Sequence, residues 1–123
     1  MDTQDFAERM AQIRQRFATK LATKIADSNS DLPSLAGDGQ SAIDAVAATY
    51  RRIHEVCGIA PTVGFIEAGR AARRLDEILI GPFREERALA TDEVARLKEG
   101  LNALEAAARI DMQSTDTGSE QIL

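Results

Sequence analysis

Aromatic residues and cysteine are scarce in this sequence of 123 residues. Four phenylalanines and one tyrosine are present, and tryptophan is absent. A hydrophobic core therefore has to be built mainly from alanine, leucine, isoleucine and valine. The single cysteine, Cys57, excludes a disulfide within the chain, which is typical of a protein in a reducing compartment.

Long apolar runs and concentrated positive charge are also lacking. No stretch of 18 or more apolar residues occurs, so no helix of the usual length would span a membrane. The formal net charge is −5, whereas a general nucleic-acid-binding protein needs a concentrated basic surface. The first ten residues, MDTQDFAERM, are acidic and polar, unlike a secretory signal. We therefore expect a cytoplasmic protein with no nucleic-acid or membrane partner.

The sequence also lacks the combinations of residues that form common metal-binding and nucleotide-binding sites. One histidine and one cysteine cannot form a His/Cys metal cluster. Di-iron bundles contain Glu-x-x-His pairs, but the residue three before His54 is Arg51. No glycine-rich loop followed by Lys and Ser or Thr is present to hold nucleotide phosphates. We expect no cofactor bound by the chain itself and no enzyme with its own ATP site.

Apolar residues recur every three or four positions in the first part of the chain, which predicts an amphipathic helix over residues 3–26. The apolar stripe of this helix consists of Phe6, Met10, Ile13, Phe17, Leu21 and Ile25. The next segment, DSNSDLPSLAGDGQ, is rich in Ser, Asp, Pro and Gly. Its composition predicts a linker over residues 27–40.

Three further helices are predicted from the same periodicity, at residues 41–60, 63–79 and 91–112. Thr91 is the predicted N-cap of the last one. No alternation of apolar and polar residues indicates a strand. The sequence therefore predicts one all-α domain over residues 1–112, an antiparallel four-helix bundle with short loops. A polar, flexible tail is predicted over residues 113–123.

The only histidine lies beside the apolar face of its predicted helix. At ~100° per residue, His54 lies about 80° from the centre of that face. Its close neighbours along the helix, Ala47 and Gly58, have almost no side chain and leave the imidazole uncovered. Gly58 costs about 1 kcal/mol of helix propensity relative to Ala, which favours a role in access. A lone histidine at a core boundary is more often an ordinary surface residue. The position of His54 on the helical wheel alone therefore leaves both interpretations open, a functional histidine and an ordinary surface residue.

The residues around the histidine resemble a known family. The family has a histidine, an apolar residue and two glycines at fixed spacing, then a helix with a Leu-Glu-like pair. In this chain these positions hold His54, Gly58, Val63, Gly64 and Leu75–Asp76. Over residues 43–79 the sequence thus resembles the histidine-containing phosphotransfer (HPt) domain of two-component phosphorelays.

The resemblance implies that His54 is a phosphoryl acceptor in a helical bundle. The phosphoryl group would pass to or from an aspartate of a response-regulator receiver domain, or be exchanged with a histidine kinase. Mg²⁺ would be bound by the partner receiver domain. Asp76 stands where the family often has Glu or Gln contacting the ring, and would orient the imidazole. The partner would contact Ala47, Gly58, Pro61 and Arg73.

The chain departs from the family at one position. Many members have a lysine three residues after the histidine, where this chain has Cys57. Arg51 or Arg73 would replace its charge beside the phosphoryl group. Residues 51–74 contain five arginines and two glutamates, a formal charge of +3. Such a surface suits docking to the acidic pocket of a receiver domain.

Two other interpretations stay open. The stripe from Phe6 to Ile25 has near-heptad spacing and would suit a docking or dimerisation module in which His54 is incidental. A degenerate phosphotransfer fold would dock a kinase or a receiver without accepting phosphate. We expect a monomer, with a homodimer through the N-terminal helix as the alternative.

Overall fold

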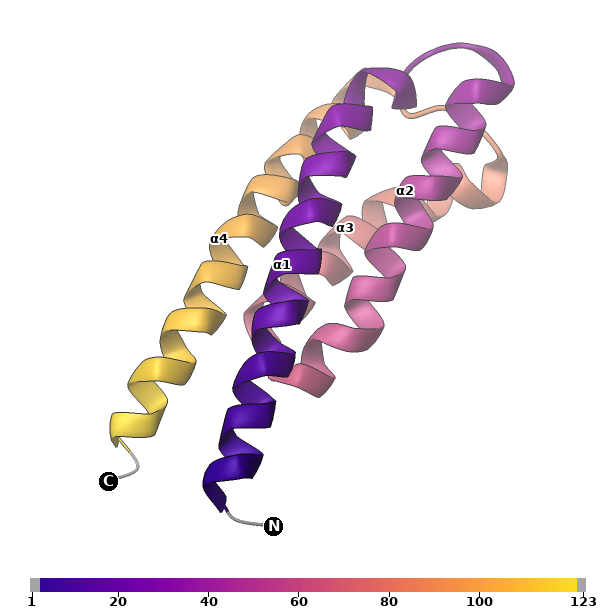
Figure 1. The fold of residues 1–123 in the computed structure, drawn as a ribbon. Helices are drawn as coiled ribbons and strands as arrows, with labels where there is room; N and C mark the ends of the chain where they lie inside the picture. Colours follow the sequence, from indigo (N-terminus) through magenta and orange to yellow (C-terminus); the bar gives the residue numbers. More distant parts are fainter. Residues whose placement is uncertain (1–2, 122–123) are drawn as a thin grey trace.

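The structure is a computed structural model that describes residues 3–121, and side chains are described for residues 3–114. It contains four α-helices and a short 3₁₀-helix, with no strand in the described residues. They are α1 (Thr3–Leu35), α2 (Gly39–Ile59), η1 (Ala60–Val63), α3 (Ile66–Glu85) and α4 (Thr91–Gln121). The chain therefore forms an all-α four-helix bundle, which confirms the predicted fold class (Figure 1).

The four helices are arranged in a square. Within the described residues, α1 packs against α2 and α4, and α3 packs against the same two helices. Successive helices run in opposite directions, and α1 and α4 extend past the ends of α2 and α3 (Figure 1). The start of α1 and the end of α4 lie at the same end of the bundle, the end at which these two helices extend past the others. The face formed by α2 and α3 is therefore opposite the face formed by α1 and α4.

The core is aliphatic, as the scarcity of aromatic residues predicts. Every α-helix contributes side chains that are almost fully buried, among them Leu21, Leu35, Ile53, Leu75, Leu79, Leu97, Leu101 and Leu104. Phe65 is the one fully buried aromatic residue, and its ring packs edge-on against Phe17 at 4.8 Å between centroids. Burial of each large side chain stabilises the fold by roughly 1.5–3 kcal/mol.

The predicted linker over residues 27–40 is mostly helix, so this boundary was wrong. The first helix continues to Leu35 because Leu32 and Leu35 are buried in the core. Ser28 is buried too, and its hydroxyl donates to the carbonyl of Lys24. Pro33 lies in the last turn, so the backbone hydrogen bond that its missing N–H would have donated is lost only at the end of the helix. Core burial here outweighs the turn-forming composition of the segment.

The first turns of α1 lie outside the core, contrary to the continuous stripe predicted from the sequence. Phe6 and Ile13 are 59% and 42% exposed, and Met10 is only half-buried. The reason is length, because α1 and α4 extend past the helices that would cover these side chains (Figure 1). The buried stripe of α1 begins at Phe17.

The last two helices are longer than predicted. The third helix begins at Ile66 rather than 63 and ends at Glu85 rather than 79, with Pro82 buried inside it. The fourth begins at Thr91 and continues to Gln121 rather than 112. Most of the predicted tail is therefore helical, and residues 122–123 lie outside the described residues. Within the described part, no helix combines the length and apolar character needed to cross a membrane.

Candidate functional site

His54 lies near the C-terminal end of α2, on the face that α2 shares with α3. Its side chain is 64% exposed. One turn further on, Gly58 leaves open space: a Cβ atom built there would meet nothing within 4 Å. On the other side, Ala47 is half-buried and small. The imidazole is therefore accessible to a large partner, as the helical wheel predicted.

A carboxylate from α3 contacts the imidazole. His54 Nδ1 lies 3.0 Å from Asp76 Oδ1, within hydrogen-bond distance. The Asp76 side chain is only 20% exposed, so the neighbouring helices restrict its position. In the neutral ring, a proton on Nδ1 is donated to this carboxylate and Nε2 keeps its lone pair. The contact expected for Asp76 is present, while its role in transfer stays a prediction.

One face of the imidazole is covered by an aromatic stack that the sequence analysis missed. The rings of Tyr50 and His54 are nearly parallel, at 25°, with centroids 5.4 Å apart. Tyr50 in turn stacks on Phe83 of α3, at 17° and 4.3 Å. The spacing of four residues between Tyr50 and His54 was the available signal, since such residues are neighbours on a helix. The stack fixes the ring plane from one side.

Arg51 points toward this stack. Its guanidinium lies over the Phe83 ring, 5.8 Å from the centroid. Arg51 lines a shallow groove together with Ala47 and Phe83. Among the described residues, no hydrogen bond joins Arg51 to His54. The Arg51 guanidinium therefore lies on the surface beside His54, against Phe83, and does not contact the imidazole.

The positive charge around the histidine comes from only some of the five arginines counted in the sequence. Arg52 forms an ion pair with Asp31 of α1 at 3.2 Å, and Arg70 forms one with Glu67 at 2.7 Å. Neither charge is free to attract a partner. Exposed Arg73, together with Arg51 and Arg74, forms no ion pair within the described part of the chain. These three arginines supply the positive surface.

Cys57 occupies the position where the resembled family often has lysine, and it is half-buried. Partial burial raises the pKa of its thiol above the ordinary value of 9.0, and the Asp76 carboxylate raises it further. The Arg73 guanidinium acts in the opposite direction. The thiol is therefore neutral near pH 7, so Cys57 supplies neither a positive charge nor a thiolate nucleophile.

A tight turn after α2 brings His54 and Asp76 together. Gly64 adopts the left-handed conformation, with φ of +82°, which a residue with a side chain rarely adopts. Pro61 packs on Gly69, where an added Cβ would lie 3.4 Å from the proline ring. The third helix can therefore approach α2 closely.

Two distant residues hold this turn in place, and sequence reasoning missed both. Arg14 of α1 donates to the carbonyls of Val63 and Asp111. The buried Asp111 carboxylate accepts from the backbone N–H groups of Glu67 and Ala68 at the start of α3. Because Arg14 and Asp111 are 97 residues apart, no local pattern could have paired them.

Comparison of the chain with protein-family models, curated proteins and solved structures finds no match. The candidate site therefore has to be interpreted from its own geometry and from the sequence resemblance. Within the described residues, no group of three or more His, Cys, Asp or Glu side chains could hold a metal ion.

Proposed function

We propose that the protein is a phosphorelay intermediate in which His54 accepts a phosphoryl group and passes it on. The partner is an aspartate of a response-regulator receiver domain, or a histidine kinase. The observation that supports this most is the pairing of an exposed imidazole with a carboxylate on its Nδ1 side. The spacing of His54, Gly58 and Gly64, which resembles the HPt domain, supports it independently.

The geometry suits attack by Nε2. A proton held on Nδ1 by Asp76 leaves the Nε2 lone pair available. The Nε2–P bond forms while the P–O bond to the aspartyl carboxyl of the receiver breaks, and the carboxylate leaves. The Nδ1 proton stays in place, so the phosphorylated ring is cationic. The Asp76 carboxylate then stabilises this charge at hydrogen-bond distance. The reverse step returns the phosphoryl group to a receiver.

The surroundings suit a protein partner rather than a small substrate. His54 lies on an open helix surface and not in a closed pocket, so most of the catalytic apparatus would belong to the partner. Mg²⁺ would be bound there by the receiver domain. The positive charge of Arg51, Arg73 and Arg74 would attract an acidic pocket during docking.

Direct phosphorylation tests the proposal. The full chain is incubated with the receiver domains of its source organism, each phosphorylated on aspartate with acetyl phosphate and then separated from the donor. We expect the chain to gain one phosphoryl group by intact-mass measurement. The label should be lost in acid and kept in base, as for a phosphoramidate.

The variant His54→Gln is the control. It should take up no label, while its helical circular dichroism stays that of the wild type, because the side chain is exposed. Acid-labile label on this variant would contradict the proposal. A receiver that binds the wild type but never transfers phosphate would instead support the alternative function, a docking module.

A further inference from the structure

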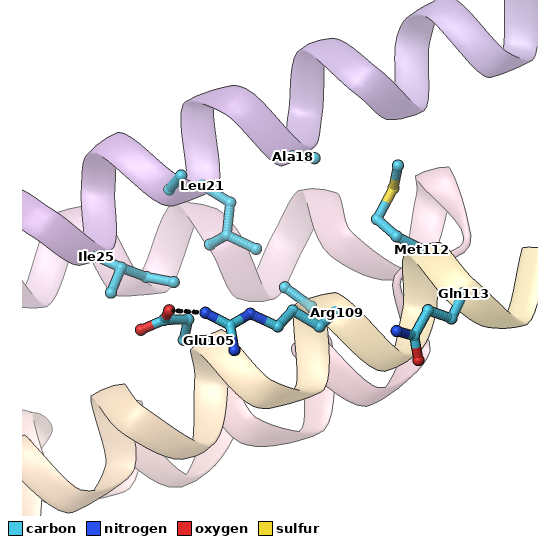
Figure 2. Close-up of a pocket in the computed structure, with 9 residues that line it drawn as sticks. Ala18, Leu21, Ile25, Glu105, Arg109, Met112 and Gln113 are labelled. Carbon is cyan, nitrogen blue, oxygen red and sulfur yellow. Dashed lines mark hydrogen bonds and ion pairs between the residues drawn. The ribbon is translucent and has the colours of Figure 1, made fainter.

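A second surface lies on the opposite side of the bundle, between α1 and α4. It is a groove of about 450 Å³, open to solvent along its length. Figure 2 shows Leu21, Ile25 and Met112 pointing into the space between the two helices. Ala18, Ala22 and Ala108 complete the apolar lining. A helix could approach closely here because the alanine side chains are short.

Two of the described residues that line this groove are charged, and they form a matched pair. Glu105 and Arg109, four residues apart on α4, form an ion pair along one edge (Figure 2). Both side chains are at least half exposed, so both are available to a partner. An occupant that is apolar in its centre and presents a positive charge opposite Glu105 and a negative charge opposite Arg109 would therefore match this groove.

A second copy of the same chain meets this requirement when the two grooves face each other with their helices antiparallel. A two-fold axis in the interface, perpendicular to the helices, places residue i against residue j of the other copy and j against i. With the axis at position 107 of α4, Glu105 of each copy lies against Arg109 of the other. Both charges are then paired twice.

The first helix can obey the same symmetry. Ala22 of α1 and Ala108 of α4 both line the groove, and the axis that crosses α4 at position 107 would cross α1 close to Ala22. Ala18 and Ala26 are placed symmetrically about Ala22. With one axis, the small residues of α1 therefore lie against the small residues of α1 in the other copy. The charged residues of α4 lie against residues of opposite charge on α4 of the other copy.

We propose that the α1–α4 groove is the interface of an antiparallel homodimer. The four helices from two copies would form a second four-helix arrangement between the two bundles. This differs from the dimer considered from the sequence, since Leu21 and Ile25 of the stripe are buried within one chain. His54 stays exposed on the opposite face of each copy. The proposal does not depend on phosphorylation of His54.

The oligomeric state of the full chain is measured by sedimentation equilibrium over a concentration series. We expect a reversible equilibrium between one and two chain masses. Ala22→Glu should shift it to monomer, raising the dissociation constant about 100-fold, because each new carboxylate would face its own copy across the axis. Ala22 is exposed, so the variant should fold. The matched control, Ala48→Glu at an exposed position of α2, should dimerise like the wild type.

Charge reversal tests the orientation. Glu105→Arg gives a chain with two arginines at the groove edge, and Arg109→Glu gives one with two glutamates. Each variant alone should be mainly monomeric. An equimolar mixture should form a heterodimer as stable as the wild-type dimer, because every arginine then faces a glutamate. If Glu105 and Arg109 acted only through the ion pair within their own helix, mixing the two variants would not restore the dimer.

A wild type that stays monomeric at its highest soluble concentration would overturn the proposal. So would a dimer that Ala22→Glu leaves intact, or a mixture of the two charge variants that stays monomeric.

Discussion

At the residue scale, the two ring nitrogens of His54 have different surroundings, and this difference decides what the ring can do. Nδ1 faces the Asp76 carboxylate at 3.0 Å. One ring face is covered by Tyr50. The side toward Gly58 is open, since nothing lies within 4 Å of a Cβ built there. The imidazole side chain is 64% exposed, so a reactive group can reach the ring from solvent.

Removal of the Asp76 carboxylate should change the tautomer of His54. In Asp76→Ala, no carboxylate holds the proton on Nδ1, so the population with the proton on Nε2 should rise. Transfer should slow by about 10- to 100-fold, the usual effect of losing a group that orients a reactive histidine. Nitrogen NMR shifts of the imidazole measure the tautomer ratio, and receiver-dependent labelling measures the rate.

Asp76→Asn serves as the matched control. Its amide oxygen can still accept the Nδ1 proton, but it lacks the negative charge that stabilises a phosphorylated, cationic ring. We expect a wild-type tautomer ratio with an intermediate rate. An unchanged tautomer ratio in Asp76→Ala would show that the carboxylate does not orient the ring.

Access to the ring should depend on Gly58. Gly58→Leu adds a large side chain beside the imidazole and should slow transfer about 100-fold, because a small displacement of the reacting groups costs that much. Gly81→Leu is the matched control: this glycine also has open space at Cβ. It lies on α3, about 140° around the helix from Asp76.

Both glycine variants should gain up to about 1 kcal/mol of helix propensity, so thermal unfolding should not separate them. Only the phosphotransfer rate should differ between the two variants. Equal rates in the two variants would mean that Gly58 has no steric role at the site.

Sequence patterns located part of this site and could not locate the rest. His54, Gly58 and Gly64 lie close together in the chain, so their spacing alone indicates a helix end with an uncovered ring. The stack of Tyr50 on Phe83 depends on the relative rotation of two helices, which no local pattern specifies. The sequence also could not tell which arginines stay unpaired, because Arg52 is paired by Asp31, which lies 21 residues earlier on another helix.

At the scale of helices, the connection between α3 and α4 is held by charge. The Arg87 guanidinium forms ion pairs with Glu85 and Glu93. Glu93 also accepts from the backbone N–H of Ala90 at 2.8 Å, which caps the start of α4. Thr91, the predicted cap, is instead the first residue of the helix. The capping group is therefore a carboxylate inside the first turn.

This cap should make stability depend on pH. Hydrogen bonding from Arg87 lowers the pKa of the Glu93 carboxyl below its ordinary value of 4.5, while partial burial opposes the change. The carboxylate is thus favoured in the folded state. Its contribution is complete above the unfolded pKa and is lost as the pH falls through the lower, folded pKa.

Glu93→Gln should therefore destabilise the protein by about 1 kcal/mol near pH 7 and by much less near pH 3. Urea unfolding at the two pH values measures the difference. Glu99→Gln is the control, since Glu99 is exposed on the same helix and forms no ion pair among the described residues. A loss that is equal at both pH values would show that the charge of Glu93 contributes nothing.

The number of helices was predictable, but their ends were not. Periodicity reports the apolar face, and four such faces are evident in the sequence. The end of α1 is decided by Leu32 and Leu35, which are buried against other helices, although Ser, Asp and Pro surround them. A rule based on local composition cannot include that burial.

At the scale of the whole molecule, the two halves of α1 should contribute unequally to stability. Deleting residues 1–12 removes exposed Phe6 and keeps Arg14, so the free energy of unfolding should fall by no more than about 1 kcal/mol. Deleting residues 1–26 also removes Phe17, Leu21 and Ile25 from the core. At roughly 1.5–3 kcal/mol each, their loss rivals a total stability of about 5–15 kcal/mol.

The longer deletion should therefore leave a largely unfolded chain, as measured by circular dichroism and urea unfolding. If it unfolds at the same urea concentration as the full chain, α1 is an appendage rather than one side of the bundle. A large loss from the shorter deletion would instead place the first turns of α1 in the core.

The aromatic stack at His54 also gives the protein an optical probe. Tyr50 is the only tyrosine and tryptophan is absent, so no other residue obscures its fluorescence. Its ring lies against the imidazole, and a phosphoryl group on that imidazole would change the charge beside the phenol. Emission from the unlabelled protein should therefore follow the state of His54 in real time, with Tyr50→Phe as the dark reference.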